Sequence, residues 1–227
     1  MINVKRFITA CMLILVLAAC GFEKELDPED VVKDVKTGQT SLDNYTFDMT
    51  FYSSFDNEFK EEVERSGQVS EADNIARTLQ VQENGTIDNS YYNQEVYFSL
   101  PEEWVPLGNT YESIGDETFA HQFFTNLIID LQDLLEFKKV DGDVHFSVEN
   151  NEEALEIYEQ YIPIQFDGDG DSSISIDGIL DGKTHYLMEV QIDIDMEVDG
   201  KSFKLGHEIS YSDFNETSVD IPDELKE

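Results

Sequence analysis

One stretch near the C-terminus constrains the fold more than any other. Seven apolar side chains occupy every second position of 186–198, and an Asp-Gly pair follows at 199–200. A period of two is typical of a strand with one buried face, and Asp-Gly is a strong signal for a two-residue hairpin turn. The pattern predicts a long antiparallel hairpin of 186–198 with 203–211, in which Ile192 lies opposite His207.

Alternation of the same kind recurs in the first half of the chain. Apolar residues at every second position of 45–51 predict another strand with one buried face. The segments 59–70, 75–84 and 87–98 predict three more strands, and the Asn-Gly pair at 84–85 predicts a tight turn between the last two. Strands that follow one another through short turns indicate an antiparallel sheet.

Three helices are expected beside this sheet. Asp27 can cap a helix that ends at Gly38, and Asn150 or Asn151 can cap a short one. Apolar residues three and four apart in 117–136 predict the main helix, with Asp116 as its cap. Its broad apolar stripe requires cover by a sheet, so the sequence predicts an α+β fold.

The first twenty residues have the pattern of a lipoprotein signal. Two bases at 5–6 precede an apolar run at 7–17 and two small residues. An uncleaved membrane helix is the alternative, but 7–22 is shorter than the roughly 20 residues that span a bilayer. A cysteine directly after small residues is similar to a bacterial lipobox. The lipobox residues are Leu17, Ala18 and Ala19, followed by the lipidated Cys20.

Cleavage before Cys20 defines the expected domain organisation. Residues 1–19 are a signal peptide, 20–30 are the lipidated cysteine with an acidic tether, and 31–227 form a single domain. Cys11 leaves with the signal and Cys20 carries lipid, so the mature chain has no free thiol. This excludes cysteine enzymes and cysteine-ligated metals.

The charge of the chain excludes other classes of partner. Loss of Lys5 and Arg6 takes the formal net charge from -36 to -38, because residues 1–20 contain no acid. Nucleic acid is not expected as a partner, since its phosphates require cationic faces. An anionic membrane would also repel the domain, which is therefore expected to stand off its anchor. A solubility adaptation explains the charge better than specific cation binding.

Candidate chemical sites are few. The segment 167–171 places carboxylates at alternating positions, but Ser172 and Gly178 occupy the places where a calcium loop needs Gly and Glu. A solvated turn is favoured, with weak Ca²⁺ affinity left open. His207 is alone on an apolar face, which is more typical of a core residue than of a metal ligand. No catalytic motif is present, so we expect no enzyme activity, no cofactor and no metal.

The chain resembles a family of Gram-positive lipoproteins of uncharacterised function. The lipobox, the acidic tether, the first helix and the 42–47 entry into the sheet carry the likeness, together with Tyr91-Tyr92, Tyr97, Trp104 and the closing 219–222. That family is similar in fold to the carrier LolA and the LppX-type lipoproteins. The resemblance implies a long curved antiparallel sheet, an unclosed half-barrel with helices across its concave face, and it implies a space for acyl chains.

Two functional classes follow. The first is a monomeric lipoprotein on the outer face of the cell membrane that binds a hydrophobic or lipid-like ligand without catalysis. The second is an envelope interaction or stress protein with a solid core and a protein partner. The residues expected to line a ligand space are Phe47, Met49, Phe123, Leu127, Ile192, Ile194 and His207.

The lipobox gives the first testable prediction. Cys20→Ala removes the thiol that would carry the lipid, so we expect the protein in the medium or as uncleaved precursor. Cell fractionation shows where the protein is found, and its mass shows whether the signal peptide has been cleaved. Mature-length Cys20→Ala protein that still partitions fully with membranes would contradict the lipobox.

Overall fold

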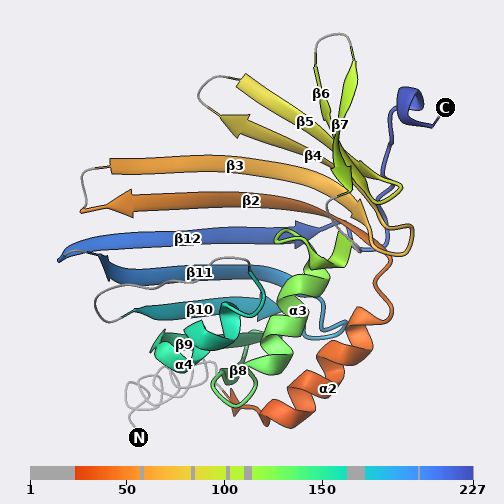
Figure 1. Ribbon diagram of the computed structural model, residues 1–227. Helices are drawn as coiled ribbons and strands as arrows, with labels where there is room; N and C mark the ends of the chain where they lie inside the picture. Colours follow the sequence, from red (N-terminus) through yellow and green to blue (C-terminus); the bar gives the residue numbers. More distant parts are fainter. Residues whose placement is uncertain are drawn as a thin grey trace, which may run out of the picture.

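Residues 24–56, 59–82, 85–100, 103–109, 114–162, 172–198 and 200–226 are described by the computed structural model of the chain. In this part of the chain twelve strands form one antiparallel sheet, which curves around three α-helices and does not close into a barrel (Figure 1). The predicted fold class is therefore confirmed: an open, curved antiparallel sheet with helices on its concave face.

The strands in chain order are β1 (Lys24–Glu25), β2 (Asn44–Phe55), β3 (Phe59–Ser70), β4 (Ile75–Gln82), β5 (Gly85–Tyr92), β6 (Glu95–Ser99), β7 (Trp104–Asn109), β8 (Glu136–Val140), β9 (Asp143–Asn151), β10 (Ser173–Leu180), β11 (Leu187–Val198) and β12 (Lys201–Ser212). The helices are α2 (Pro28–Gln39), α3 (His121–Asp130) and α4 (Glu152–Tyr158), with short 3-10 turns η1 (Ile114–Asp116) and η2 (Asp223–Leu225). Across the sheet the order is β1-β8-β9-β10-β11-β12-β2-β3-β4-β5-β6-β7.

The C-terminal hairpin has the predicted register. Val198 pairs with Lys201, and Ile192 pairs with His207. The alternation departs from the prediction only at the start of β11. There Ile179 pairs with Glu189 but Leu180 pairs with Leu187, so Met188 is the extra residue of a β-bulge. The bulge places Leu187 on the buried face of the sheet, whereas the alternation alone predicted that Met188 would be the buried residue.

The segment predicted as one strand at 87–98 forms two strands instead. β5 ends at Tyr92, which pairs with Glu95 at the start of β6. Asn93 and Gln94 lie between them with φ of 53° and 64°. Two consecutive residues with positive φ form the tight hairpin turn that matches the twist of the strands. No glycine marks this turn in the sequence.

The fold begins earlier than the predicted domain start at residue 31. Lys24 and Glu25 form β1 and pair with β8. α2 starts at Pro28, and the Asp27 carboxylate accepts a hydrogen bond of 3.0 Å from the Glu29 backbone N–H, so this predicted cap is confirmed. Residues 24–30 are thus part of the folded domain and do not belong to the predicted 20–30 tether. The signal peptide, the lipobox and Cys20 lie outside the described residues.

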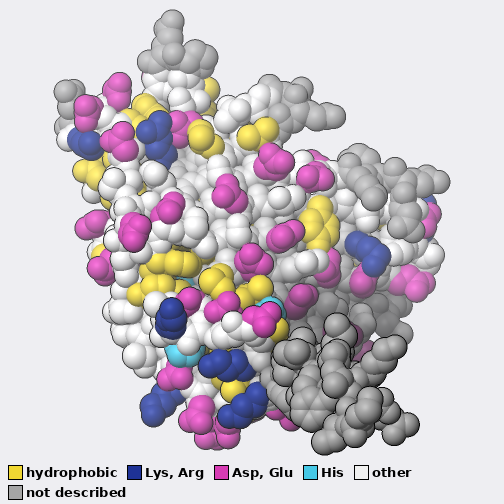
Figure 2. All heavy atoms as spheres, turned by 180° about the vertical axis from the view of Figure 1, so that it is seen from behind, with side chains coloured by type: hydrophobic (Ala, Val, Ile, Leu, Met, Phe, Trp, Pro, Cys, Tyr) yellow, Lys and Arg dark blue, Asp and Glu magenta, His cyan; other side chains and the backbone are white. Residues whose placement is uncertain are grey.

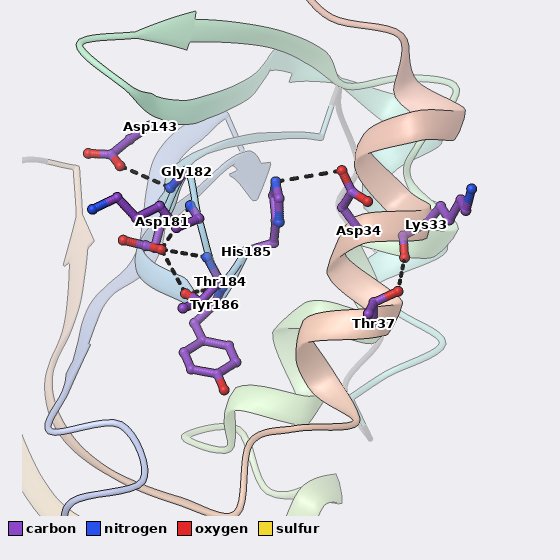
Figure 3. Close-up of polar contacts among 10 residues, drawn as sticks. Lys33, Asp34, Thr37, Asp143, Asp181, Gly182, Thr184, His185 and Tyr186 are labelled. Carbon is purple, nitrogen blue, oxygen red and sulfur yellow. Dashed lines mark hydrogen bonds and ion pairs between the residues drawn. The ribbon is translucent and has the colours of Figure 1, made fainter.

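The turn between β10 and β11 lies directly against α2 (Figure 3). A Cβ atom on Gly38 would lie 2.5 Å from the Thr184 backbone oxygen, so only glycine permits this close approach of helix and turn. The Asp181 carboxylate accepts from the Thr184 backbone N–H at 2.7 Å, and this hydrogen bond lowers the pKa of Asp181. Asp34 of α2 points toward His185, with 3.7 Å between the carboxylate oxygen and Nε2.

The main helix α3 is shorter than the predicted 117–136, and Asp116 does not cap it. The helix starts at His121, and the cap position belongs to Ala120, whose side chain offers no hydrogen-bond acceptor. Two side chains from the sheet replace a local cap. The Tyr45 hydroxyl accepts from the His121 N–H at 2.8 Å, and the Glu71 carboxylate accepts from the Gln122 N–H at 3.1 Å.

These caps form a buried network. The Tyr45 hydroxyl donates to the same Glu71 oxygen at 2.9 Å. Burial raises the pKa of Glu71 and lowers the pKa of His121 to about 3, so His121 is neutral at pH 7. Its Nε2 accepts from the Leu187 N–H at 2.9 Å. The first turn of α3 is therefore bound to β2, to the turn after β3 and to β11. Farther along the chain Asn151 caps α4, as predicted, by accepting from the Ala154 N–H.

The network gives a stability prediction at Glu71. Glu71→Ala leaves the Tyr45 hydroxyl and the Gln122 N–H without their acceptor, so we expect a loss of about 1–3 kcal/mol in the free energy of unfolding. Glu71→Gln keeps an oxygen acceptor and serves as the matched control. Urea denaturation of the three proteins between about pH 4 and pH 8 is the measurement.

The pH dependence of the control follows from the sign of the pKa shift. The pKa of Glu71 in the folded state lies above its ordinary value of 4.5. The contribution of the carboxyl group is therefore fully present below the ordinary value and declines as pH rises through the raised pKa. Wild type should lose stability relative to Glu71→Gln over that interval. A difference between the two proteins that is independent of pH would contradict the burial of a titrating Glu71.

Candidate functional site

The concave face under α3 is filled by aromatic side chains. The rings of Phe47 and Phe119 stack with 4.9 Å between their centroids. The ring of Phe124 lies 5.5 Å from that of His207. Such stacked and tilted arrangements are the favourable ones for aromatic pairs, so the sheet and α3 are in direct side-chain contact here.

Of the seven residues predicted to line a ligand space, five lie on the concave face of the sheet, and Phe123 and Leu127 lie on α3. Six of them are at most 5 % exposed: Phe47, Phe123, Leu127, Ile192, Ile194 and His207. Met49 alone is half-buried and packs against the edge of the core. Their role as ligand-lining residues stays a prediction. Their burial means that a ligand between sheet and helix would have to displace side chains that now contact one another.

The helices cover only part of the concave face. A strand of twelve residues, such as β2, β3 or β12, is about 40 Å long, whereas a helix that crosses the strands, as α3 does, is only about 10–12 Å wide with its side chains. In Figure 1, α3 starts close to the right-hand ends of β2 and β12 and runs down across β11 and β10, and no described helix lies in front of the left-hand halves of β2, β3 and β12. The strands therefore extend well beyond α3.

Apolar side chains continue along these uncovered halves and form what we call the open strip. On β2 the exposed fraction of the inward side chains rises along the strand, from buried Tyr45 and Phe47 to 36 % at Phe55. The same change occurs on β12, from buried Ile209 to half-buried Phe203. Phe203 pairs directly with Phe55, and their ring centroids lie 6.5 Å apart. The open strip consists of Met49, Phe51, Phe55, Phe203 and Leu205.

A positive charge lies where the open strip meets the covered core. Arg65 of β3 pairs with Met49, and its guanidinium carbon is 4.4 Å from the centroid of the Phe119 ring. The guanidinium donates to the Tyr91 hydroxyl and, at 3.3 Å, to the Thr78 hydroxyl. No carboxylate of the described residues forms an ion pair with Arg65, although acids outnumber bases 50 to 14 in the chain.

His207 lies at the same boundary. Burial lowers its pKa to about 4, so the imidazole is neutral at pH 7. Its Nε2 has no hydrogen-bond partner among the described residues. On the strands, His207 pairs with Ile192 on one side and with Phe51 of the open strip on the other. A buried polar atom without a partner costs free energy, so this position would be stabilised by any hydrogen-bonding group that reached it.

The convex face of the sheet is mainly polar and acidic, with hydrophobic side chains such as Leu79 and Val81 exposed among the polar ones. Figure 2 shows Asp and Glu side chains spread over this face, with fewer Lys and Arg side chains among them. A shallow hollow of about 290 Å³ lies over Gly178, and Asp177, Glu189 and Glu208 are among its lining residues. Among the residues that the structure describes, no group of three or more His, Cys, Asp or Glu could hold a metal ion. The 167–171 segment lies outside them.

The fold and the face described above define a class of protein: an open α+β half-barrel whose concave face is apolar and only partly covered by helices. No protein-family model matches the chain, and no curated protein matches its sequence. None of the described helices is both long enough and apolar enough to cross a membrane.

Three solved structures are similar to the chain. LprF from Mycobacterium bovis is 11% identical, with 86% of this chain and 97% of that chain covered and a TM-score of 0.38. A LolA superfamily protein from Nitrosomonas europaea is 7% identical, with 88% and 97% covered and a TM-score of 0.35. A DUF1329 family protein from Desulfovibrio piger is 10% identical, with 89% and 98% covered and a TM-score of 0.31. These distant likenesses assign neither a family nor a function to the chain.

Sequence reasoning missed most of the open strip. The alternation places Phe51, Phe203 and Leu205 on the apolar face, but it does not tell which part of that face a helix covers. The sequence does not give the direction in which the helix crosses the sheet. Because α3 runs across the strands, it covers only its own width of them, and some inward apolar residues remain uncovered.

The difference between the covered face and the open strip can be measured by stability. Ile192→Ala removes atoms from a fully buried position and should lower the free energy of unfolding by about 2–5 kcal/mol. Leu205→Ala, in the half-buried strip, should cost less than Ile192→Ala because fewer contacts are lost. Urea denaturation measures both variants. Equal losses would mean that the strip is as closely packed as the core.

Proposed function

We propose that this chain is a lipoprotein, held by a lipid on Cys20 at the outer face of the cell membrane, that binds a lipid-like ligand without catalysis. The signal pattern of residues 1–20 supports the anchor. The single observation that carries the binding function is the open strip, an apolar surface that continues the core and is covered by none of the described helices.

Energetics favour an occupant on this strip. Apolar surface gains roughly 25 cal/mol for each Å² removed from water, so half-exposed phenylalanine and leucine side chains in a row bind apolar chains favourably. Contiguous apolar surface on a soluble domain commonly marks a binding site. The strip is long and narrow, about 20 Å from Met49 to Phe55 along β2. That shape fits an extended acyl chain.

The residues at the end of the open strip that meets the covered core indicate the chemistry of the ligand's polar group. Arg65, beside Met49, supplies a positive charge with no carboxylate partner among the described residues. His207 supplies a neutral imidazole whose Nε2 lacks a partner there. A carboxylate or phosphate group would accept a charge-assisted hydrogen bond from the guanidinium. We therefore propose an amphiphile with an anionic end, such as a fatty acid or a phospholipid.

A specific observation also favours the second candidate, an interaction protein with a solid core. The interior beneath α3 is filled by side chains, and the edge strand β7 exposes more than half of Leu107. An unpaired sheet edge can accept a strand from a protein partner. This candidate predicts no bound lipid and no stabilisation by amphiphiles, so one set of measurements separates the two.

The deciding measurement is native mass spectrometry of the protein extracted without detergent, combined with thermal unfolding. We expect an added mass in the range of a lipid and a higher melting temperature with hexadecanoic acid, through mass action on the folded state. The effect of hexadecanol should be smaller, since it has no anionic end. Only the apo mass, together with no shift from either probe or from phosphatidylglycerol, would leave the interaction protein as the better account.

A pair of variants tests the position of the site. Phe55→Asp places a charge at the outer end of the open strip and should weaken hexadecanoic acid binding roughly tenfold. Leu79→Asp is the matched control, because Leu79 is similarly exposed, 44 % against 36 %, but lies on the convex face. Equal effects of the two substitutions would show that the acyl chain binds elsewhere.

A further inference from the structure

The basic residues of this acidic chain are concentrated at one end of the molecule. The segments 24–40, 136–145 and 181–185 together contain six Lys and nine Asp or Glu. The rest of the chain after residue 23 contains six Lys or Arg and forty Asp or Glu. We call these three segments the lysine end. Its six lysines are Lys24, Lys33, Lys36, Lys138, Lys139 and Lys183.

The three segments form one surface. β1 pairs with β8, and α2 approaches the 184–185 backbone through Gly38. The Gly182 N–H donates to the Asp143 carboxylate at 3.0 Å, which joins the 181–185 turn to the start of β9. Figure 2 shows Lys and Arg side chains gathered at the lower edge of the molecule, where these segments lie.

The lysines of this surface are largely unpaired. Lys138 forms an ion pair with Glu136 at 3.3 Å, and the other five form none with described residues. Those five side chains are exposed. Figure 3 shows Lys33 pointing away from the turn that α2 contacts. Lys24 lies directly opposite Lys139 across the β1–β8 pair, and like charges in that position destabilise a sheet. An external anion between them would remove this cost.

The lysine end is also the end from which the chain leads to the anchor. β1 begins at Lys24, only four residues after Cys20. Four residues of fully extended chain reach at most about 14 Å. A lipid on Cys20 would therefore hold Lys24, the first residue of β1, within about that distance of the membrane, with β8 as the neighbouring strand.

We infer that the lysine end is a docking surface for the anionic outer face of the lipid bilayer to which the protein is anchored. This inference rests on the lipid anchor proposed above, and it replaces the expectation, drawn from the net charge alone, that the whole domain stands off the membrane. Anionic headgroups attract the exposed lysines of this end, where acids exceed bases by only three, nine against six. In the remainder of the domain acids exceed bases by thirty-four, forty against six, so the headgroups repel it far more strongly. Both effects favour one orientation, in which β1, β8 and α2 face the bilayer and the β11–β12 turn points away.

Site-directed spin labelling of the mature lipoprotein in vesicles tests this orientation. Cys11 leaves with the signal and Cys20 is lipidated, so an introduced cysteine is the single free thiol. Thr37→Cys places the label on the exposed face of α2, and Ser202→Cys places it at the far end of β12. The vesicles contain phosphatidylcholine with or without phosphatidylglycerol, and a nickel-chelating headgroup lipid relaxes labels close to the surface.

With phosphatidylglycerol, we expect relaxation at Thr37→Cys to exceed that at Ser202→Cys by roughly threefold or more, and the difference to shrink at high salt. Lys33→Glu with Lys36→Glu should abolish the difference, and Lys139→Glu with Lys183→Glu should do the same from β8 and the turn. Lys201→Glu with Lys204→Glu is the matched control, with the same charge change at the far end, and should preserve it. Circular dichroism verifies that each variant is folded.

Flotation of the same vesicles separates the anchor from the docking. Protein that floats but relaxes equally at the two labels overturns the docking surface and leaves the anchor intact. Protein that does not float overturns the anchor and, with it, the docking. A difference between labels that is unchanged by the lysine substitutions also overturns the docking, because the short link alone would then orient the domain.

Discussion

The start of α3 is set by two hydrogen bonds from its backbone to the sheet, and the arrangement of the concave face depends on them. The His121 and Gln122 N–H groups donate to Tyr45 and Glu71, and no local side chain caps the helix. A helix terminus without such acceptors would leave buried donors unsatisfied. These contacts hold the first turn of α3 near the Tyr45 end of β2, so the helix crosses the sheet at that end of the strands and leaves their other end uncovered.

This placement divides one apolar face into two parts with different properties. Beneath α3, aromatic rings contact one another and two histidines are held neutral by burial. Beyond α3, the same strands carry partly exposed apolar side chains that none of the described helices covers. A solid core and a binding surface therefore coexist in this fold. The first supplies stability, and the second supplies the capacity that we propose for a lipid-like ligand.

The uneven distribution of charge favours one orientation of the domain relative to the membrane. A net charge of -36 is unfavourable near anionic lipids, yet the lysine end holds half of the bases that follow residue 23. Because β1 joins the sheet at Lys24, little chain separates these lysines from Cys20. The acidic charge of the other surfaces then favours solubility and keeps them away from the bilayer, so the two charge patterns are compatible.

The sequence by itself determined the elements whose signals are local. Alternation with Asp-Gly fixed the register of β11 and β12, and Asp27 and Asn151 cap helices that start within three residues of them. It also identified side chains that face the core, because six of the seven residues expected to line a ligand space are buried, four on the sheet and two on α3. Only the tertiary structure decided where α3 begins, because its cap Glu71 is 51 residues distant from Gln122. It also decided that Lys24 joins the sheet beside Lys139, and which apolar residues remain uncovered. These outcomes depend on contacts between segments far apart in the chain, for which a local pattern carries no signal.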